Sequence, residues 1–256
     1  MPHYERYVAI GDSTSEGLDD PDGRGGYRGW ANRLAEHIAA RQGSVLYANL
    51  AIRGRTTRQI REEQLDKAVA MRPSLTTVVS GTNDLLRGRF DPAGLTQDIE
   101  AMQQAMIDAG ATVLTFTLPD MRAVMPLSRL FDERRRRLNQ IVRDVSARTG
   151  AIVADMDVYP VASDPRVWSG DRLHANSAGH ARIAEALAYH AGYTDVGMAW
   201  AEPLPNPPRP TPLDLVKAEM AWMRIHFVPW LWRHARGISS GDGITAKFPE
   251  LVRVEK

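Results

Sequence analysis

The sequence predicts an α/β fold in which helices cover both faces of a parallel sheet. Short apolar runs alternate with segments of helical spacing from about residue 7 to residue 190, and strands that alternate with helices in this way favour parallel pairing. The chain of 256 residues is long enough to bury a full core. Its 43% hydrophobic and 25% charged residues are ordinary for a globular protein.

Five strands are expected, because five short runs are rich in apolar or β-branched residues. The first covers Tyr7 to Ile10, and Gly11 ends it. In chain order, the predicted strands cover residues 7–10, 45–50, 75–80, 112–118 and 151–156. In a parallel sheet, ligands bind at the loops beyond the carboxyl ends of the strands, so we expect the functional site at that edge.

Helices are expected between the strands and after the last one. Trp30, Leu34 and Ile38 form one apolar stripe in the first helix. Pro92 takes a first-turn position that helices tolerate, and Asn176 or Ser177 caps the last helix. The predicted helices cover residues 27–42, 57–71, 91–108, 127–149 and about 177–190.

The alternation of strands and helices stops after residue 191, and a proline-rich segment follows. This change predicts a domain over residues 1–200 and an extension over residues 201–256. The extension opens with a stiff linker that contains Pro203, Pro205, Pro207, Pro208, Pro210 and Pro212. A helical pattern over residues 213–236 is apolar almost all round, with a kink expected at Pro229. A Gly/Ser turn over residues 237–243 and a short polar end follow.

Two interpretations of this C-terminal helix remain open. The simpler one, which we favour, is a helix that folds back onto the domain. The other is peripheral membrane contact through residues 213–236, since Trp and Arg suit the lipid–water boundary. The basic positions that would support membrane contact are Lys217, Arg224, Arg233, His234 and Arg236.

Composition and charge exclude several classes of protein. The net charge is +1, so nothing indicates a nucleic-acid partner, and the run Arg134–Arg137 is expected to be a solvated helix face. The absence of cysteine excludes disulfides, thiolate metal sites and a cysteine nucleophile. No apolar leader segment precedes the first strand and no window approaches the roughly 18 apolar residues that span a bilayer, so we expect a cytoplasmic location.

Ser13 stands out in the loop Gly11-Asp12-Ser13-Thr14-Ser15-Glu16-Gly17, directly after the first strand. A serine at a sharp strand-to-helix turn projects its hydroxyl from the sheet and leaves nearby N–H groups free. Asp12 is expected to brace this turn by hydrogen bonds. Taken alone, the string fits an ordinary loop with a serine cap equally well.

Two further loops offer hydrogen-bond donors. Gly54 follows the second strand and lets the backbone approach a ligand closely. Asn83, in Gly81-Thr82-Asn83-Asp84 after the third strand, can aim its side-chain NH₂ at a developing oxyanion. Each alone is more typical of a turn or a helix cap.

The fourth loop carries Asp171 and His174, three residues apart. An aspartate at this spacing can reach the Nδ1–H of the histidine, which leaves Nε2 to accept the proton of a serine. His180, on the next helix, is expected at the helix surface without a ligand role. Because all four loops follow predicted strands, the sequence favours one site at which a serine, two donors and a base converge.

These four segments resemble the sequence blocks of the SGNH hydrolases, also called the GDSL esterase/lipase family. Ser13 matches the Gly-Asp-Ser block, Gly54 the glycine block, Asn83 the Gly-x-Asn-Asp block and His174 the Asp-x-x-His block. The order agrees from about residue 7 to residue 190. Ala175 and Asn176 depart slightly from the family, in which a proline often follows the histidine.

The resemblance implies a three-layer α/β/α sandwich with a central sheet of about five parallel strands, followed here by the C-terminal helical extension. It implies a catalytic triad of Ser13 as nucleophile, His174 as base and Asp171 as its orienter. The oxyanion hole would consist of the N–H groups of Ser13 and Gly54 and the side chain of Asn83. No cofactor and no metal are expected.

The expected reaction is hydrolysis of a small-molecule carboxylic ester, such as a short-chain ester, an acetylated sugar or a lysophospholipid. The polar, Gly-rich loop over residues 17–27 lies beside Ser13 and is expected to shape the pocket, which argues slightly against a deep acyl tunnel. An acyltransferase with the same triad and a non-catalytic lipid- or carbohydrate-binding relative remain alternatives. The oligomeric state is open.

Overall fold

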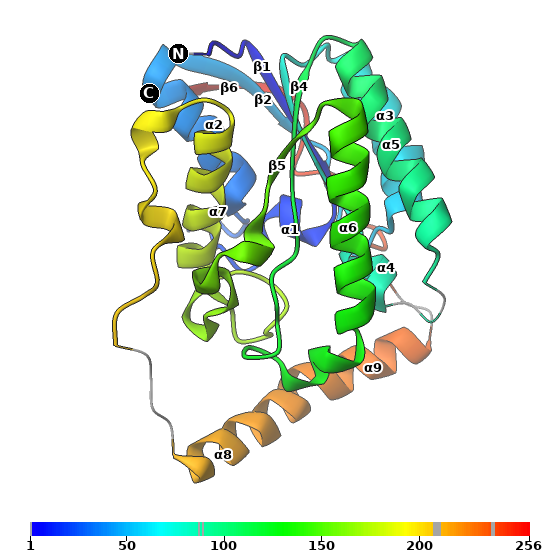
Figure 1. Cartoon of the computed structure of the whole chain (residues 1–256), viewed down its shortest axis with the longest axis vertical. Coiled ribbons are helices and arrows are strands. Elements are labelled where there is room, and N and C mark those ends of the chain that lie inside the picture. Colours follow the sequence, from blue (N-terminus) through cyan, green and yellow to red (C-terminus); the bar gives the residue numbers. More distant parts are fainter. Residues whose placement is uncertain (1, 87, 89, 207–210, 237–238) are drawn as a thin grey trace.

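A mixed sheet of six strands organises the protein (Figure 1), in the order β5-β4-β3-β1-β2-β6. The computed structural model describes residues 2–86, 88, 90–206, 211–236 and 239–256, without the side chains of residues 230 and 233–235. The strands are β1 (Arg6–Gly11), β2 (Ser44–Asn49), β3 (Leu75–Val79), β4 (Thr112–Phe116), β5 (Ile152–Ala154) and β6 (Phe248–Glu255). The first five pair in parallel, as predicted.

The sixth strand corrects the expectation of a short polar end. β6 pairs antiparallel with β2, with Val254 opposite Val45 and Val252 opposite Tyr47. The chain thus returns after the C-terminal helix and adds an edge strand to the sheet formed by β1 to β5. Much of β6 is exposed, which explains why its sequence lacks the apolar run of a buried strand.

Nine α-helices lie in the described part of the chain. They are α1 (Ser13–Glu16), α2 (Gly29–Gln42), α3 (Thr57–Ala70), α4 (Thr82–Leu86), α5 (Pro92–Asp108), α6 (Asp132–Thr149), α7 (Ser177–His190), α8 (Pro212–Trp222) and α9 (Val228–Ala235). The predicted helix over residues 127–149 divides into a 3-10 turn, Pro126–Leu130, and α6. Asn176 caps α7 by accepting the Gly179 N–H, as expected.

The helices form the two outer layers of the predicted sandwich. Figure 1 shows α2 and α7 on one side of the sheet and α3, α5 and α6 on the other. Alternate residues of β1 serve the two cores: Tyr7 and Ala9 pack in the core that includes α2 and α7, whereas Val8 and Ile10 pack in the core that includes α3 and α5. This period of two is the geometry of a strand buried on both faces.

The C-terminal helix is interrupted just before the predicted kink at Pro229. Met223–Phe227 form a π-helical turn between α8 and α9, in which the Val228 N–H donates to the Met223 carbonyl. Proline lacks an N–H and its ring crowds the carbonyl four residues earlier, so a wider turn at this point relieves the crowding. None of the helices among the described residues is long and apolar enough to cross a bilayer.

Some predicted features fall outside the described residues. They include Pro207, Pro208 and Pro210 of the linker, Gly237 of the Gly/Ser turn, and the side chains of Trp230, Arg233 and His234. The division of the chain at residue 200 stays a prediction.

Candidate active site

Ser13 lies at the sharp turn between β1 and α1, as predicted. Asp12 caps α1 by accepting the Thr14 N–H at 3.0 Å, so it braces the turn. A Cβ on Gly11 would lie 2.3 Å from the Ser15 hydroxyl and 2.7 Å from the Val79 carbonyl oxygen. Only glycine fits at this place. Ser13 is the first residue of α1, a position whose N–H has no partner within the helix.

Ser13, His174 and Asp171 form a series of hydrogen bonds. The Nε2 atom of His174 lies 2.8 Å from the Ser13 hydroxyl, and its Nδ1 lies 2.6 Å from Oδ2 of Asp171. The carboxylate fixes the proton on Nδ1, which leaves Nε2 as the acceptor that faces the serine. The structure thus brings together one residue from the start of α1 and two from the loop before α7.

The loop that carries Asp171 holds its carboxylate firmly. The second oxygen, Oδ1, accepts the backbone N–H groups of Leu173 and His174 at 2.8 and 3.0 Å. It also lies 2.6 Å from the Ser169 hydroxyl. Both carboxylate oxygens therefore act as acceptors, and their partners hold the pKa of Asp171 well below its ordinary value despite burial.

Burial opposes the charge on His174, but the hydrogen bond and the negative charge of Asp171 outweigh it. The pKa of His174 is therefore raised above its ordinary value. A raised pKa makes the imidazole a stronger base for the serine proton. Asp12 also has a raised pKa, about 6, because it is fully buried, although its bond from Thr14 acts in the opposite direction.

Asn83 and Gly54 lie beside this turn, but not all their donors are free. The Nδ2 atom of Asn83 lies 3.1 Å from Oδ2 of Asp12 and 3.0 Å from the Arg55 carbonyl oxygen. Asn83 thus bridges the serine turn to the loop that contains Gly54. Both amide hydrogens of Asn83 already have acceptors. To donate to an oxyanion, Asn83 must therefore share one of these hydrogens or turn it away from its present acceptor.

Gly54 has a positive φ of 75°, a conformation that favours glycine. A segment of the C-terminal extension covers it, since a Cβ there would lie 2.5 Å from the Ser239 hydroxyl and 3.0 Å from the Ser240 hydroxyl. The packing of residues 239–241 on this loop was not expected from the sequence.

Sequence reasoning also missed Asp19 and the role of Ser169. The Ser169 hydroxyl lies 2.5 Å from Asp19 and 2.6 Å from Asp171, so it separates two carboxylates beside the histidine. Among the described residues, Asp19, Asp171 and His174 are close enough together to hold a metal ion. Because both ring nitrogens of His174 already face Asp171 and Ser13, we assign no metal there.

Two residues that the sequence placed at the surface are buried. His180 is 1% exposed, accepts the Trp30 N–H at Nδ1 and donates from Nε2 to the Leu18 carbonyl, so its expected surface position is wrong. Burial lowers its pKa to about 4, which keeps the ring neutral. Arg135 of the arginine run is 9% exposed and pairs with Asp132.

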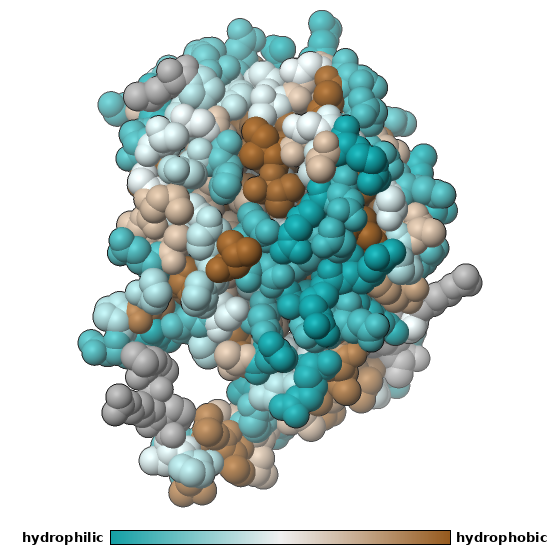
Figure 2. Space-filling view, viewed as in Figure 1, coloured by the Kyte–Doolittle hydropathy of each residue, from teal (hydrophilic) through white to brown (hydrophobic). Residues whose placement is uncertain are grey.

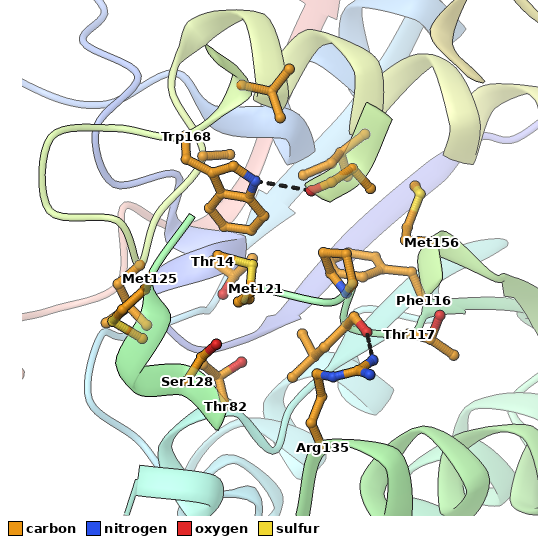
Figure 3. Close-up of a pocket in the computed structure, with 18 of the residues that line it drawn as sticks. Thr14, Thr82, Phe116, Thr117, Met121, Met125, Ser128, Arg135, Met156 and Trp168 are labelled. Atoms are coloured by element: carbon orange, nitrogen blue, oxygen red, sulfur yellow. Dashed lines mark hydrogen bonds between the residues drawn. The ribbon is translucent and has the colours of Figure 1, made fainter. Parts of the chain in front are cut away.

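A mostly apolar pocket of about 140 Å³ adjoins Ser13 and His174. Thr14, Thr82 and Leu173 line it, and each is the chain neighbour of Ser13, Asn83 or His174. Figure 3 shows aromatic and methionine side chains around the cavity, with Arg135 bonded to the Leu118 carbonyl at its edge. Other lining residues are Leu85, Phe116, Met121, Met125, Met156 and Trp168. No residue of the Gly-rich loop 17–27 lines this pocket, contrary to expectation.

The fold and the site together fit an ester hydrolase, in which Ser13 follows the end of β1 and His174 meets it from the loop before α7. The chain belongs to the GDSL-like lipase/acylhydrolase family, whose model matches residues 9–182, and with it to the SGNH hydrolase superfamily. It is therefore an enzyme of the esterase or lipase kind.

Several characterised proteins are similar to this chain. An acetylxylan esterase of Geobacillus stearothermophilus is 23% identical over 215 residues, which cover 74% of this chain and 94% of that enzyme. One similar structure is that of LAE5, an α/β hydrolase enzyme from the metagenome of Lake Arreo. It has a TM-score of 0.62 at 19% identity, and the match covers 75% of this chain and 97% of LAE5. The structure of a lipase/acylhydrolase of Enterococcus faecalis has a TM-score of 0.59 at 22% identity. The match covers 73% of this chain and 96% of that protein. These structures support the fold, and each leaves about a quarter of this chain unmatched.

Proposed function

We propose that the protein hydrolyses carboxylic esters through an acyl-enzyme formed on Ser13. One observation carries this proposal: the unbroken series of hydrogen bonds from the Ser13 hydroxyl through both nitrogens of His174 to Asp171, at 2.8 and 2.6 Å. Free serine is a weak nucleophile, and a base within hydrogen-bond reach is what activates it.

In the proposed cycle, Ser13 Oγ attacks the carbonyl carbon while its proton passes to His174 Nε2. The resulting imidazolium is stabilised by Asp171 and gives this proton to the departing alkoxide. Water then attacks the acyl-enzyme, His174 takes the proton of that water and returns it to Ser13, and the carboxylic acid leaves. The N–H groups of Ser13 and Gly54 and the Asn83 amide would stabilise the oxyanion.

The apolar pocket beside Ser13 supports an acyl group longer than acetyl. Its volume of about 140 Å³ is close to that of a cavity of about 150 Å³ that takes up benzene. An acyl chain of comparable size would bury its methylenes against Phe116, Met121 and Met156. We therefore propose short- to medium-chain esters as substrates. Acetylated sugars, suggested by the acetylxylan esterase relative, would leave much of this pocket unfilled.

Turnover of p-nitrophenyl esters from acetate to decanoate tests both parts of the proposal. We expect a maximum at an intermediate chain length and no turnover by Ser13→Ala. A fluorophosphonate probe should label the native protein and not this variant, because only an activated serine reacts quickly. Turnover by Ser13→Ala would refute the nucleophile, whereas a preference for acetate would refute only the chain length.

The same experiments separate the two alternatives. A non-catalytic binding relative would show neither labelling nor turnover. An acyltransferase would label, but would form a new ester in preference to free acid when an alcohol is added.

A further inference from the structure

The helix over residues 212–235, which we call the C-terminal helix, lies at the active-site end of the molecule. Figure 1 shows α8 and α9 crossing that end, below α4 and the lower end of α6. The helix is attached to the loop that carries Asp171: the indole Nε1 of Trp222 donates to the Asp171 carbonyl oxygen at 2.9 Å. Glu219 pairs with Arg172 at 2.6 Å, and the Arg172 guanidinium lies 5.1 Å from the centre of the Trp222 ring.

Apart from the side that contacts the loop of Asp171, most side chains of this helix are exposed, and many of them are apolar. Nine of the fifteen exposed large apolar side chains among the described residues belong to it, and Met220 is 68% exposed. Figure 2 shows brown, hydrophobic groups along the helix at the foot of the molecule. The nine are Leu213, Leu215, Val216, Met220, Met223, Ile225, Val228, Leu231 and Trp232. An exposed apolar patch of this kind marks an interaction surface.

Charge indicates what this surface binds. The C-terminal helix carries three cations, Lys217, Arg224 and Arg233, against two carboxylates, Asp214 and Glu219, and Glu219 is paired with Arg172. From residue 220 to residue 241 the sequence contains three arginines and no acidic residue. Lys217 and Arg224 are exposed within the apolar face, and the Arg236 guanidinium lies 3.4 Å from the centre of the Trp232 ring. Apolar side chains interleaved with cations and a tryptophan suit the boundary between acyl chains and anionic headgroups.

We propose that the exposed face of the C-terminal helix binds an anionic lipid surface. The helix would lie in the plane of the surface, because it is not both long and apolar enough to cross it. Through Trp222 it would hold the loop that carries Asp171 against that surface. If the proposed hydrolysis holds, the apolar pocket then receives acyl esters from the lipid, but binding itself does not depend on catalysis.

Co-sedimentation with vesicles tests the proposal in the full-length chain. The vesicles contain phosphatidylcholine alone or phosphatidylcholine with phosphatidylglycerol, and the variants are M220E/I225E and the control V158E/M198E. All four side chains are exposed and apolar, but the control pair lies outside the helix. We expect anionic vesicles to bind the native protein and the control, and to bind M220E/I225E at least about tenfold more weakly.

A second pair of variants tests the role of charge. K217Q/R224Q should weaken binding to anionic vesicles and make it less sensitive to salt, while binding to phosphatidylcholine stays weak. Thermal melting confirms that each variant folds, and turnover of a water-soluble ester reports separately on the active site. Loss of that turnover in the native protein would defeat the proposed hydrolysis and leave the vesicle result intact.

Three outcomes would overturn the lipid proposal. The first is that the native protein does not sediment with anionic vesicles, and the second is that M220E/I225E binds as well as the native protein. The third is that light scattering without vesicles shows a dimer that M220E/I225E dissociates, with no vesicle binding. That result would assign the apolar face to a second copy of the chain.

Discussion

The indole of Trp222 donates a hydrogen bond to the backbone carbonyl of Asp171, across 51 residues of sequence and a distance of 2.9 Å. Trp222 is buried, unlike most of the apolar residues of its helix. Asp171 in turn accepts from His174. The C-terminal extension therefore contacts the residue that orients the proposed catalytic base.

Trp222→Phe should lower kcat on a soluble ester by about three- to tenfold, the effect of losing one neutral hydrogen bond. We assign Trp222 a positioning role, so the pH profile should change as well. A less well-held Asp171 raises the pKa of His174 by a smaller amount, and the acidic limb of kcat/KM should move to lower pH. A change in KM with an unaltered pH profile would contradict this role.

The acidic limb of the native pH profile should lie above the ordinary histidine pKa of about 6.5. The pKa of His174 is raised because the bond and charge of Asp171 outweigh burial. Below that pKa the ring is protonated and cannot accept the serine proton, so activity falls as the pH falls. Measurement of kcat/KM across pH on an uncharged ester checks this. A limb below 6.5 would show that the carboxylate does not control the base.

Asp171→Asn should reduce kcat by about 10⁴-fold. Both oxygens of the carboxylate accept hydrogen bonds, Oδ1 from backbone N–H groups and Oδ2 from the ring. An asparagine would place its NH₂ against one of these donors, or would force the proton of His174 onto the wrong nitrogen. Rates and melting temperatures of the variant should be measured together. A loss explained by unfolding would not support the orienting role.

Asn83→Ala should lower kcat by about 10²–10³-fold with little change in KM, if its amide stabilises the oxyanion. The bonds of Asn83 to Asp12 and Arg55 offer a competing structural role. Thermal melting separates the two, since a bracing residue lowers stability in proportion to activity. A full-rate variant with a lower melting temperature would remove Asn83 from the oxyanion hole.

Ala162→Leu should narrow the pocket and change the choice of acyl chain. Ala162 lines the cavity, so the added methylenes would occupy the space of a longer acyl group. We expect kcat/KM for hexanoate to fall at least about tenfold while that for acetate changes little. Val158→Leu is the matched control, because Val158 is exposed nearby in the chain and does not line the pocket. Equal losses for both esters would place the acyl group elsewhere.

The parallel sheet and the ends of its strands could be predicted because their signals are local. Buried parallel strands are apolar runs, and Ser13, Asn83 and His174 each follow a recognisable short pattern. The burial of His180 could not be predicted in this way. Its environment is made by Trp30 and Leu18, more than 100 residues away in the chain.

The contacts of the extension are equally non-local. The residues of β6 are exposed or half-buried, and only the pairing of this segment with β2 shows that it is a strand. The cover of residues 239–241 over Gly54 depends on how the chain returns after the C-terminal helix. Lys247 anchors that return by donating to the carbonyls of Glu16, Tyr27 and Arg28. No periodicity in the sequence reports contacts of this kind.

Because β6 pairs with β2, the C-terminal helix is anchored to the sheet after its end as well as joined to the chain before its start. A protein truncated at the linker would lose β6 together with the helix, and the unpaired N–H and C=O groups along β2 would become an open edge. Such an edge invites association with other chains, so aggregation of the truncated protein is the expected consequence. Engineering that preserves the last strand, for example by a short bridge in place of the helix, would keep β2 paired with β6.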